Sequence, residues 1–298
     1  MTKNKSTILR GMTRDGSARF LVINSTEMVN KIIKMHHTSP TATAAMGRLA
    51  SAASMIGTLL PENGNTLTIQ TVTEGQISSM VTVSDYYGNV KGYIVGADAD
   101  PPRKSNGKLN VSAALGDGYI AVMKDLGTGT PSCGTTSLVS GEIAEDLASY
   151  FADSEQIPTL LSLGVLVDVD YTCKGAGGVL VQLMPFPDEE TVTLLERNAA
   201  DLSSISRLVA EGKSNEEIAA IALRDIPFDL FDTLEVEYKC DCTKARVRKK
   251  LRALGDKQLK ELFDDQEKDD GTRALTTVCR FCSKKYVFEE KDLLPEKK

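Results

Sequence analysis

The sequence predicts an α+β protein: a core domain with an antiparallel or mixed β-sheet packed with helices, then a helical linker and a small C-terminal domain. Three observations indicate this. Strand-like runs and helical periodicity alternate as far as Met184, short helical segments follow Pro185-Phe186-Pro187, and two close cysteine pairs stand near the C-terminus. We therefore expect domains at residues 1–187, 188–239 and 240–298, for which a chain of 298 residues is long enough.

The N-terminal part begins with a strand and two helices. Residues 18–24 have the pattern of a first strand, and residues 26–36 carry apolar side chains at helical spacing. A second helix opens at Ser39-Pro40, because Ser39 can cap free N–H groups and Pro40 lacks the N–H that would have no partner at the first helical position. Small residues such as Ala45, Ala52 and Ala53 line its face through residue 60, so we expect it to pack closely.

Strand signals dominate the middle of the chain. Residues 66–73, 78–84 and 89–95 predict an antiparallel meander, and residues 109–115 and 119–124 a further hairpin. A helix is expected to start at Ser140. Residues 163–169 and 179–184 read as buried strands about a glycine-rich turn at residues 175–178, which lacks the Lys-Ser/Thr ending of a phosphate loop.

The helical linker and the tail contain short segments. The linker has helical patterns at residues 189–202, 205–210 and 215–222. In the tail, residues 243–278 separate the cysteine pairs and predict two short helices, with Val247, Leu251 and Leu254 on the first and Leu259, Leu262 and Phe263 on the second. These apolar faces are thin and residues 264–270 are acidic, so the order of the tail must depend on another constraint.

Four cysteines supply that constraint. They form the pairs Cys240-Asp241-Cys242 and Cys279-Arg280-Phe281-Cys282. Two sulfurs at each of two points suit Zn²⁺, which takes four ligands tetrahedrally, and a closed four-sulfur site favours a structural or thiol-regulatory role over catalysis. Residues i and i+2 of an extended backbone point to one side, so Cys240 and Cys242 can face one ion. Spacing alone leaves open paired thiols that hold no zinc.

Composition limits the class of protein. With 41% hydrophobic residues the chain can bury a core. The first ten residues have no apolar signal core, and the most apolar later stretch carries Arg48, so no secretion signal or membrane span is expected. Six cysteines without a secretion signal favour a reducing compartment, which we take to be the cytoplasm.

The net charge of −6 is unevenly distributed. Residues 240–298 hold 16 Lys and Arg against 12 Asp and Glu, so the tail carries +4 and residues 1–239 carry −10. The simplest explanation of the basic tail is a helix face that is exposed to solvent. An alternative function is a zinc-ribbon nucleic-acid binder, but aromatic residues for base stacking are sparse and nucleic acid is not an expected partner. Its basic residues would be Lys244, Arg246, Arg248, Lys249, Lys250 and Arg252.

No pattern of an enzyme emerges. The chain has no recognisable nucleotide loop, nucleophile–base pair or open metal site. The carboxylates Glu142, Glu145, Asp146 and Glu155 are explained mainly by a helix start, where negative charge is favourable. Cys133 and Cys173 match no nucleophile arrangement, and we interpret them as small buried or turn cysteines.

Several ordered motifs resemble the bacterial 33 kDa chaperonin family, which are redox-regulated heat-shock holdases. The resemblance covers nearly the whole chain. Beside the cysteine pairs it rests on residues 39–45 (SPTATAA), 140–147 (SGEIAEDL), 154–158 (SEQIP) and 163–168 (LGVLVD). One departure is the insert of 36 residues between the cysteine pairs, which is longer than is usual in this family, apparently from extra residues at 266–272. The departure affects the expected activation threshold more than metal binding.

The resemblance implies a binding protein of the stress response that acts in protein folding. Cys240, Cys242, Cys279 and Cys282 would hold Zn²⁺ as thiolates in the reduced, inactive protein. Hypochlorite, or peroxide with mild heat, would release the ion and form the disulfides Cys240–Cys242 and Cys279–Cys282. The redox-switch tail and the linker would then lose structure, and the chaperone, often as a homodimer, would bind unfolded or misfolding client proteins without ATP through its core domain.

Overall fold

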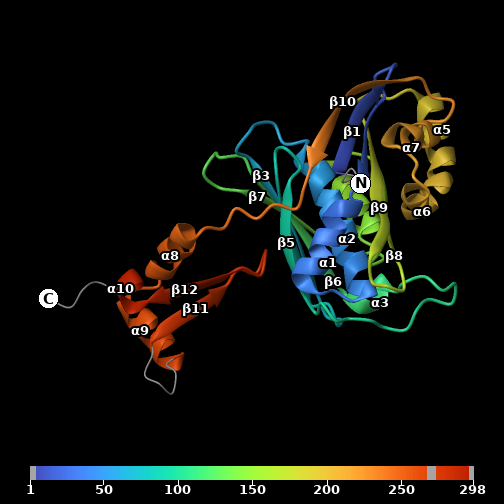
Figure 1. Cartoon of the computed structure of the whole chain (residues 1–298). Coiled ribbons are helices and arrows are strands. Elements are labelled where there is room, and N and C mark those ends of the chain that lie inside the picture. Colours follow the sequence, from blue (N-terminus) through green and yellow to red (C-terminus); the bar gives the residue numbers. More distant parts are fainter. Residues whose placement is uncertain (1–4, 267–272, 295–298) are drawn as a thin grey trace. The chain divides into compact units, whose positions relative to one another are not determined.

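The computed structural model describes residues 5–266 and 273–294. The chain divides into two compact units, Met1–Lys239 (unit 1) and Cys240–Lys298 (unit 2), each with its own apolar core (Figure 1). Residues 188–239, expected as a separate linker, pack within unit 1. The elements are helices and antiparallel strands, which confirms the α+β prediction.

Unit 1 contains two five-stranded antiparallel sheets. The first has the strand order β10 (Phe228–Val236), β1 (Ser6–Thr13), β2 (Ala18–Asn24), β9 (Cys173–Leu183) and β8 (Thr159–Val167). The second has the order β5 (Val90–Val95), β4 (Ser79–Asp85), β3 (Thr66–Thr73), β6 (Gly118–Asp125) and β7 (Ser132–Ser137). The expected meander β3–β5 is therefore confirmed, with β3 also pairing β6.

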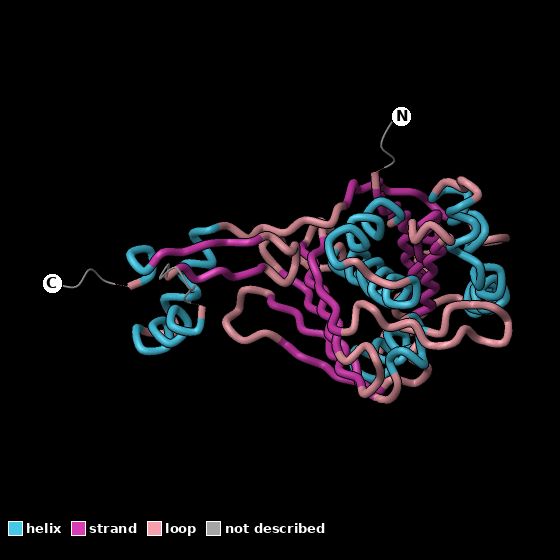
Figure 2. The backbone as a smooth tube through the Cα atoms, turned by 60° about the horizontal axis from the view of Figure 1, so that its bottom comes forward, coloured by secondary structure: helices cyan, strands magenta, loops and turns pink. Residues whose placement is uncertain are grey.

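Helices fill the space between the two sheets. Helices α1 (Thr26–His36) and α2 (Pro40–Gly57) lie there, and strands stand on either side of them in Figure 2. Nearly every residue of α2 is buried, because its small side chains let both sheets approach. The predicted cap is also present, since the Ser39 side chain accepts a hydrogen bond from the Ala42 N–H at 3.1 Å.

The outer face of the first sheet is covered by the helices of the linker. They are α5 (Glu189–Ala199), the 3₁₀ turn η2 (Ala200–Ser204), α6 (Ile205–Ala210) and α7 (Asn215–Ala222). Phe20, Val22 and Val181 of the sheet are buried against apolar side chains of these helices, such as Leu202 and Ile218. Figure 1 shows α5, α6 and α7 together on the side of β9 that faces away from α2. We call this buried contact the linker interface.

Two strands of the first sheet were not predicted. β1 precedes the strand that the sequence analysis took as the first, and β10 follows the helical segments of the linker. The two pair with each other over more than 200 residues of sequence, Ser6 opposite Val236 and Thr13 opposite Phe228. β10 is an edge strand with most side chains exposed, so it lacks the alternation that marks a half-buried strand.

Two predictions in the middle of the chain were wrong. The segment taken as a strand at residues 109–115 contains helix α3 (Val111–Leu115), because the Asn110 side chain caps it by accepting from the Ala113 N–H. The glycines at 175–178 lie inside β9 and not in a turn. A Cβ at Gly175 would stand 2.4 Å from the Ser206 carbonyl oxygen and 2.7 Å from the Ala210 nitrogen, so glycine is needed there for α6 to approach the sheet.

The helix expected from Ser140 begins later. Helix α4 spans Ala144–Tyr150 and continues into a π-helical turn, η1 (Phe151–Glu155). Before it, the backbone N–H groups of Val139, Ser140, Gly141 and Ile143 all donate to the buried Asp146 carboxylate at 2.8–3.1 Å. Because the Asp146 carboxylate binds these four N–H groups, residues 139–143 form a loop, and the helix begins only at Ala144.

Unit 2 is small. Its elements are α8 (Lys244–Arg252), α9 (Asp256–Asp265), β11 (Ala274–Val278), β12 (Lys285–Glu289) and α10 (Glu290–Leu293). The two predicted helices are present, but Leu254 lies beyond α8 and is 45% exposed. The core consists of Leu259, Phe263, Leu275, Tyr286, Phe288 and Leu293. Residues 267–272, which contain most of the expected extra residues and the end of the acidic stretch, lie outside the described residues.

Within residues 5–266 and 273–294, no helix is both long and apolar enough to cross a membrane.

Candidate metal centre

The first cysteine pair lies in extended chain before α8. Cys240 and Cys242 are both partly buried, and the Thr243 side chain caps α8 by accepting from the Arg246 N–H at 3.2 Å. Arg246 also donates to the Asp241 carbonyl and carboxylate. The residue between the two sulfurs is thereby tied to the helix, which fixes the direction of the pair.

The second pair lies in the turn that joins β11 to β12. The Cys279 N–H donates to the Lys284 carbonyl at 2.9 Å, and the Ser283 N–H donates to the Cys279 carbonyl at 2.8 Å. Ser283 takes a left-handed conformation with φ of 56°, which closes the turn. A tight turn of this kind directs the two sulfurs of a Cys-x-x-Cys sequence to one point.

The structure brings the four sulfurs together. All four lie within 4.8 Å of one another, with Cys240 and Cys279 sulfurs 3.8 Å apart and Cys242 and Cys282 sulfurs 3.3 Å apart. Sulfurs bound tetrahedrally to one Zn²⁺ at about 2.3 Å stand about 3.8 Å from each other. The donor set and its spacing therefore fit a four-sulfur metal site.

The thiols differ in acidity when no metal is bound. Burial raises the pKa of Cys240 and of Cys282. At Cys242 burial also opposes ionisation, but hydrogen bonds from the Tyr286 hydroxyl and neighbouring thiols outweigh it and lower the pKa to about 7. A metal must displace the protons that Cys240 and Cys282 hold at neutral pH, so metal affinity is expected to fall further as the pH is lowered.

Tyr286 is a residue of this site that the sequence analysis missed. Its hydroxyl lies 3.0 Å from both the Cys242 sulfur and the Cys242 carbonyl oxygen, while its ring is part of the unit 2 core. A tyrosine in a strand gives no local sign of such a contact, since the two residues are 44 positions apart. A hydroxyl that donates to a ligating thiolate stabilises its charge and fixes its orientation.

The change Tyr286→Phe is expected to weaken zinc binding about 10-fold to 100-fold, because it removes a hydrogen bond to a ligand and keeps the ring. Competition of the reduced protein with a chromogenic chelator measures this affinity. Tyr87→Phe is the control, since Tyr87 is half exposed in unit 1 and its change should leave the affinity unaltered. An unchanged affinity in Tyr286→Phe would contradict the assigned contact.

The remaining cysteines lie apart from the centre. Cys173 is buried in β9, where burial raises the pKa of its thiol to about 12 and makes it unreactive. The interpretation of Cys133 as a buried or turn cysteine is wrong, because Cys133 is exposed on the edge strand β7. His36 contacts the Tyr238 hydroxyl at 3.0 Å.

The carboxylates of Glu142, Glu145, Asp146 and Glu155 do not act together, since the structure gives them separate surroundings. Glu142 pairs with Arg48 at 2.6 Å and also with Lys104. Asp146 binds the loop before α4, and Glu155 pairs with Lys124 and accepts from Tyr150. Glu145 lies in the first turn of α4, where the helix dipole favours it. Their roles are in packing and capping.

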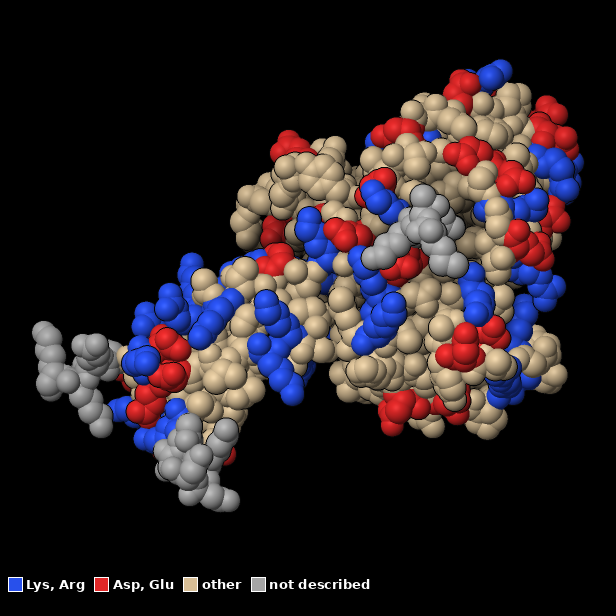
Figure 3. All heavy atoms as spheres, viewed as in Figure 1, with Lys and Arg blue, Asp and Glu red and all other residues tan. Residues whose placement is uncertain are grey.

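Basic side chains gather over unit 2 on the face shown in Figure 3. Lys244 pairs with Asp292 at 3.6 Å, and Arg246 pairs with Asp241. Among the described residues no ion pair is found for the four other basic residues of α8: Arg248, Lys249, Lys250 and Arg252. None of the six is part of the cysteine cluster.

Fold and site together define an α+β protein with a closed four-cysteine centre in a small C-terminal unit. A family model described as Hsp33 protein matches residues 6–289. The 33 kDa chaperonin of Clostridioides difficile is 41% identical over 288 residues, covering 96% of this chain and 97% of its own. That of Ruminiclostridium cellulolyticum is 39% identical and covers 96% of each chain.

A solved structure agrees. The 33 kDa chaperonin (heat shock protein 33 homolog) of Thermotoga maritima superposes with a TM-score of 0.88 at 33% identity, covering 97% of each chain. The class is thus that of non-enzymatic chaperones. The chain belongs to the Hsp33 family, as the sequence motifs predicted.

Proposed function

We propose that this protein is an ATP-independent holdase that oxidation switches on. In the reduced, inactive state Cys240, Cys242, Cys279 and Cys282 hold Zn²⁺ as thiolates. The observation that carries the proposal is the cluster of four sulfurs within 4.8 Å, which joins the start of unit 2 to its β11–β12 turn in a unit that has only a small core. The clients are unfolded or misfolding proteins, and the setting is a reducing compartment such as the cytoplasm.

Oxidation supplies the switch. In each pair one thiolate attacks peroxide and becomes a sulfenic acid with loss of hydroxide, and the second thiolate displaces the remaining hydroxide to form the disulfide. Two thiolates, one H₂O₂ and two protons thus give one disulfide and two waters. Two peroxides consume all four ligands, and the site then no longer holds the ion.

The disulfides are proposed within the close pairs, as Cys240–Cys242 and Cys279–Cys282. The shortest sulfur distances run across the pairs, from Cys240 to Cys279 and from Cys242 to Cys282. Once the ion is gone and unit 2 unfolds, closing a loop of three or four residues costs much less entropy than closing one of about 40, and this favours the close pairs.

The linker interface supplies the surface for clients. Fifteen buried apolar residues form this second core, with Leu9, Phe20, Val22, Val179 and Val181 on the sheet side. If the linker loses structure together with unit 2, this face of the sheet becomes accessible, and contiguous apolar surface of this kind binds unfolded chains. We also propose that the oxidised form is a homodimer. Light scattering measures its molar mass and so tests this.

A peroxide titration of the reduced protein tests the proposal. Zinc release, free thiols and suppression of aggregation of a heat-unfolded client are measured together, in a Cys133→Ser background because that thiol is exposed. We expect loss of four thiols, one zinc ion and a parallel gain in protection, and peptide mapping should locate the two proposed disulfides. Equal protection by the reduced, zinc-loaded protein, or zinc loss without protection, contradicts the switch.

A further inference from the structure

The last residues of unit 1 bridge the two sheets. β10 ends at Val236 on the edge of the first sheet, and the next three residues, Glu237, Tyr238 and Lys239, run parallel to β5 on the edge of the second. We call these three residues the strap. The Val90 N–H donates to the Glu237 carbonyl at 3.0 Å, and the Lys239 N–H donates to the Val90 carbonyl at 2.7 Å. The strap thus covers the exposed edge of β5.

Tyr238 is the anchor of the strap. Its side chain is 3% exposed, and its hydroxyl donates to the Gly92 carbonyl at 2.6 Å and accepts from the Gly92 N–H at 3.1 Å. A single hydroxyl thereby satisfies both outward backbone groups of an edge residue, as a neighbouring strand would. Because its one proton goes to Gly92, the 3.0 Å contact with His36 is a hydrogen bond when His36 Nε2 carries a proton.

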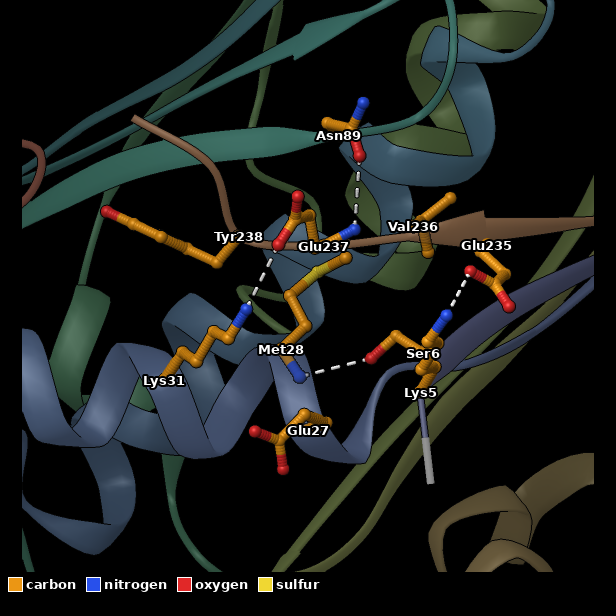
Figure 4. Close-up of a pocket in the computed structure, with 10 residues that line it drawn as sticks. All are labelled: Lys5, Ser6, Glu27, Met28, Lys31, Asn89, Glu235, Val236, Glu237 and Tyr238. Carbon is orange, nitrogen blue, oxygen red and sulfur yellow. Dashed lines mark hydrogen bonds and ion pairs between the residues drawn. The ribbon is translucent and has the colours of Figure 1, made fainter. Parts of the chain in front are cut away.

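The strap is incompletely packed on its other side. A cavity of about 320 Å³ lies between it, helix α1 and the start of β1 (Figure 4). Across this cavity Lys31 pairs with Glu237 at 3.2 Å, and the Glu237 N–H donates to the Asn89 side chain at 3.2 Å. The strap is therefore held by the Tyr238 ring, which packs in the core of unit 1, and by these hydrogen bonds and the ion pair.

The strap also has a special place in the chain. Lys239 is followed directly by Cys240, the first cysteine of the metal centre, and the strap forms the last three residues of the linker, directly after β10. Loss of structure in unit 2 can therefore spread along the chain to β10 and helices α5 to α7 only through residues 237–239. When unfolding spreads from unit 2 along the chain, it meets the bonds of the strap to β5 before the pairing of β10 with β1.

We propose that Tyr238 is a positioning residue that controls how readily loss of the metal centre opens the linker. This inference rests on the proposed function and adds a separate step to it. Metal release depends on the cysteines, whereas linker opening depends on the Tyr238–Gly92–His36 contacts. This step slows the opening of the linker, so the linker stays closed after brief or partial loss of the metal.

The test compares Tyr238→Phe with Tyr150→Phe. Both changes keep a buried ring and remove one hydroxyl from unit 1, but Tyr150 bonds Glu155, far in sequence from the strap. Zinc is removed with a chelator from each full-length reduced protein. A metal-sensitive dye follows zinc release, and hydrogen exchange followed by mass spectrometry reports the opening of β10 and of helices α5 to α7.

For Tyr238→Phe we expect unchanged zinc release and linker opening about tenfold faster, because buried backbone groups of Gly92 lose their partner. Tyr150→Phe should behave like the natural protein, although its thermal stability falls as well. If the linker opens at the same rate in Tyr238→Phe and in the natural protein, the role of the strap is overturned and the proposed function is not affected. If zinc loss opens the linker in neither protein, the proposed function itself fails.

Discussion

Removal of the metal from the reduced protein with a chelator is expected to unfold unit 2 and to leave the second sheet of unit 1, which contains β3 and β6, folded. Among the described residues of unit 2, six buried apolar residues form the core, with Cys242 and Cys279 packed against them. A structural zinc site contributes about 10–16 kcal/mol of apparent binding free energy, whereas a whole domain is stable by only about 5–15 kcal/mol. The core of unit 2 is too small to replace that contribution.

Hydrogen exchange resolved by segment checks this expectation. Amides of α9, β11 and β12 should lose their protection on addition of the chelator, while amides of β3 and β6 keep theirs. Excess zinc should restore the protection, which controls for damage by the chelator. Persistent protection of β11 and β12 without metal would falsify the claim that the centre supports the fold of unit 2.

Local patterns were sufficient for much of this fold. Ser39 and Pro40 define the start of α2, and the alternation in β3 to β5 identifies the meander. The strands β1 and β10 could not be predicted, because they are stabilised by each other across the length of the chain. The glycines of β9 resemble a turn in sequence. They are needed because α6 approaches the sheet closely, and this contact exists only in the folded chain.

The candidate site also contains residues that could be predicted from the sequence and residues that could not. The four cysteines were predicted from their spacing and their resemblance to a family, and the structure brings their sulfurs together. Tyr286 contributes through a contact that spans 44 residues, and Tyr238 bonds Gly92 across 146 residues. When a side chain bonds a backbone group far away in the sequence, the residues around that side chain show no pattern that predicts the contact.

Truncation of the linker interface is expected to activate the protein without oxidant. Ile218 of α7 is fully buried against the outer face of the first sheet, and Ile218→Ala removes packing that belongs to the linker side. Such a change costs about 2–5 kcal/mol, and 2 kcal/mol already raises the population of the open linker about 30-fold. The reduced, zinc-loaded variant should therefore suppress aggregation of a heat-unfolded client.

The matched control is Ile69→Ala in β3, which removes an equally buried isoleucine from the core between the sheets and not from the linker interface. It should lower the melting temperature by a similar amount and give no protection while reduced. Protection by both variants means that general instability is the cause, and protection by neither means that the sheet face beneath the linker is not the surface for clients. Zinc content is measured in both, because retention of the ion by an active Ile218→Ala protein separates linker opening from metal loss.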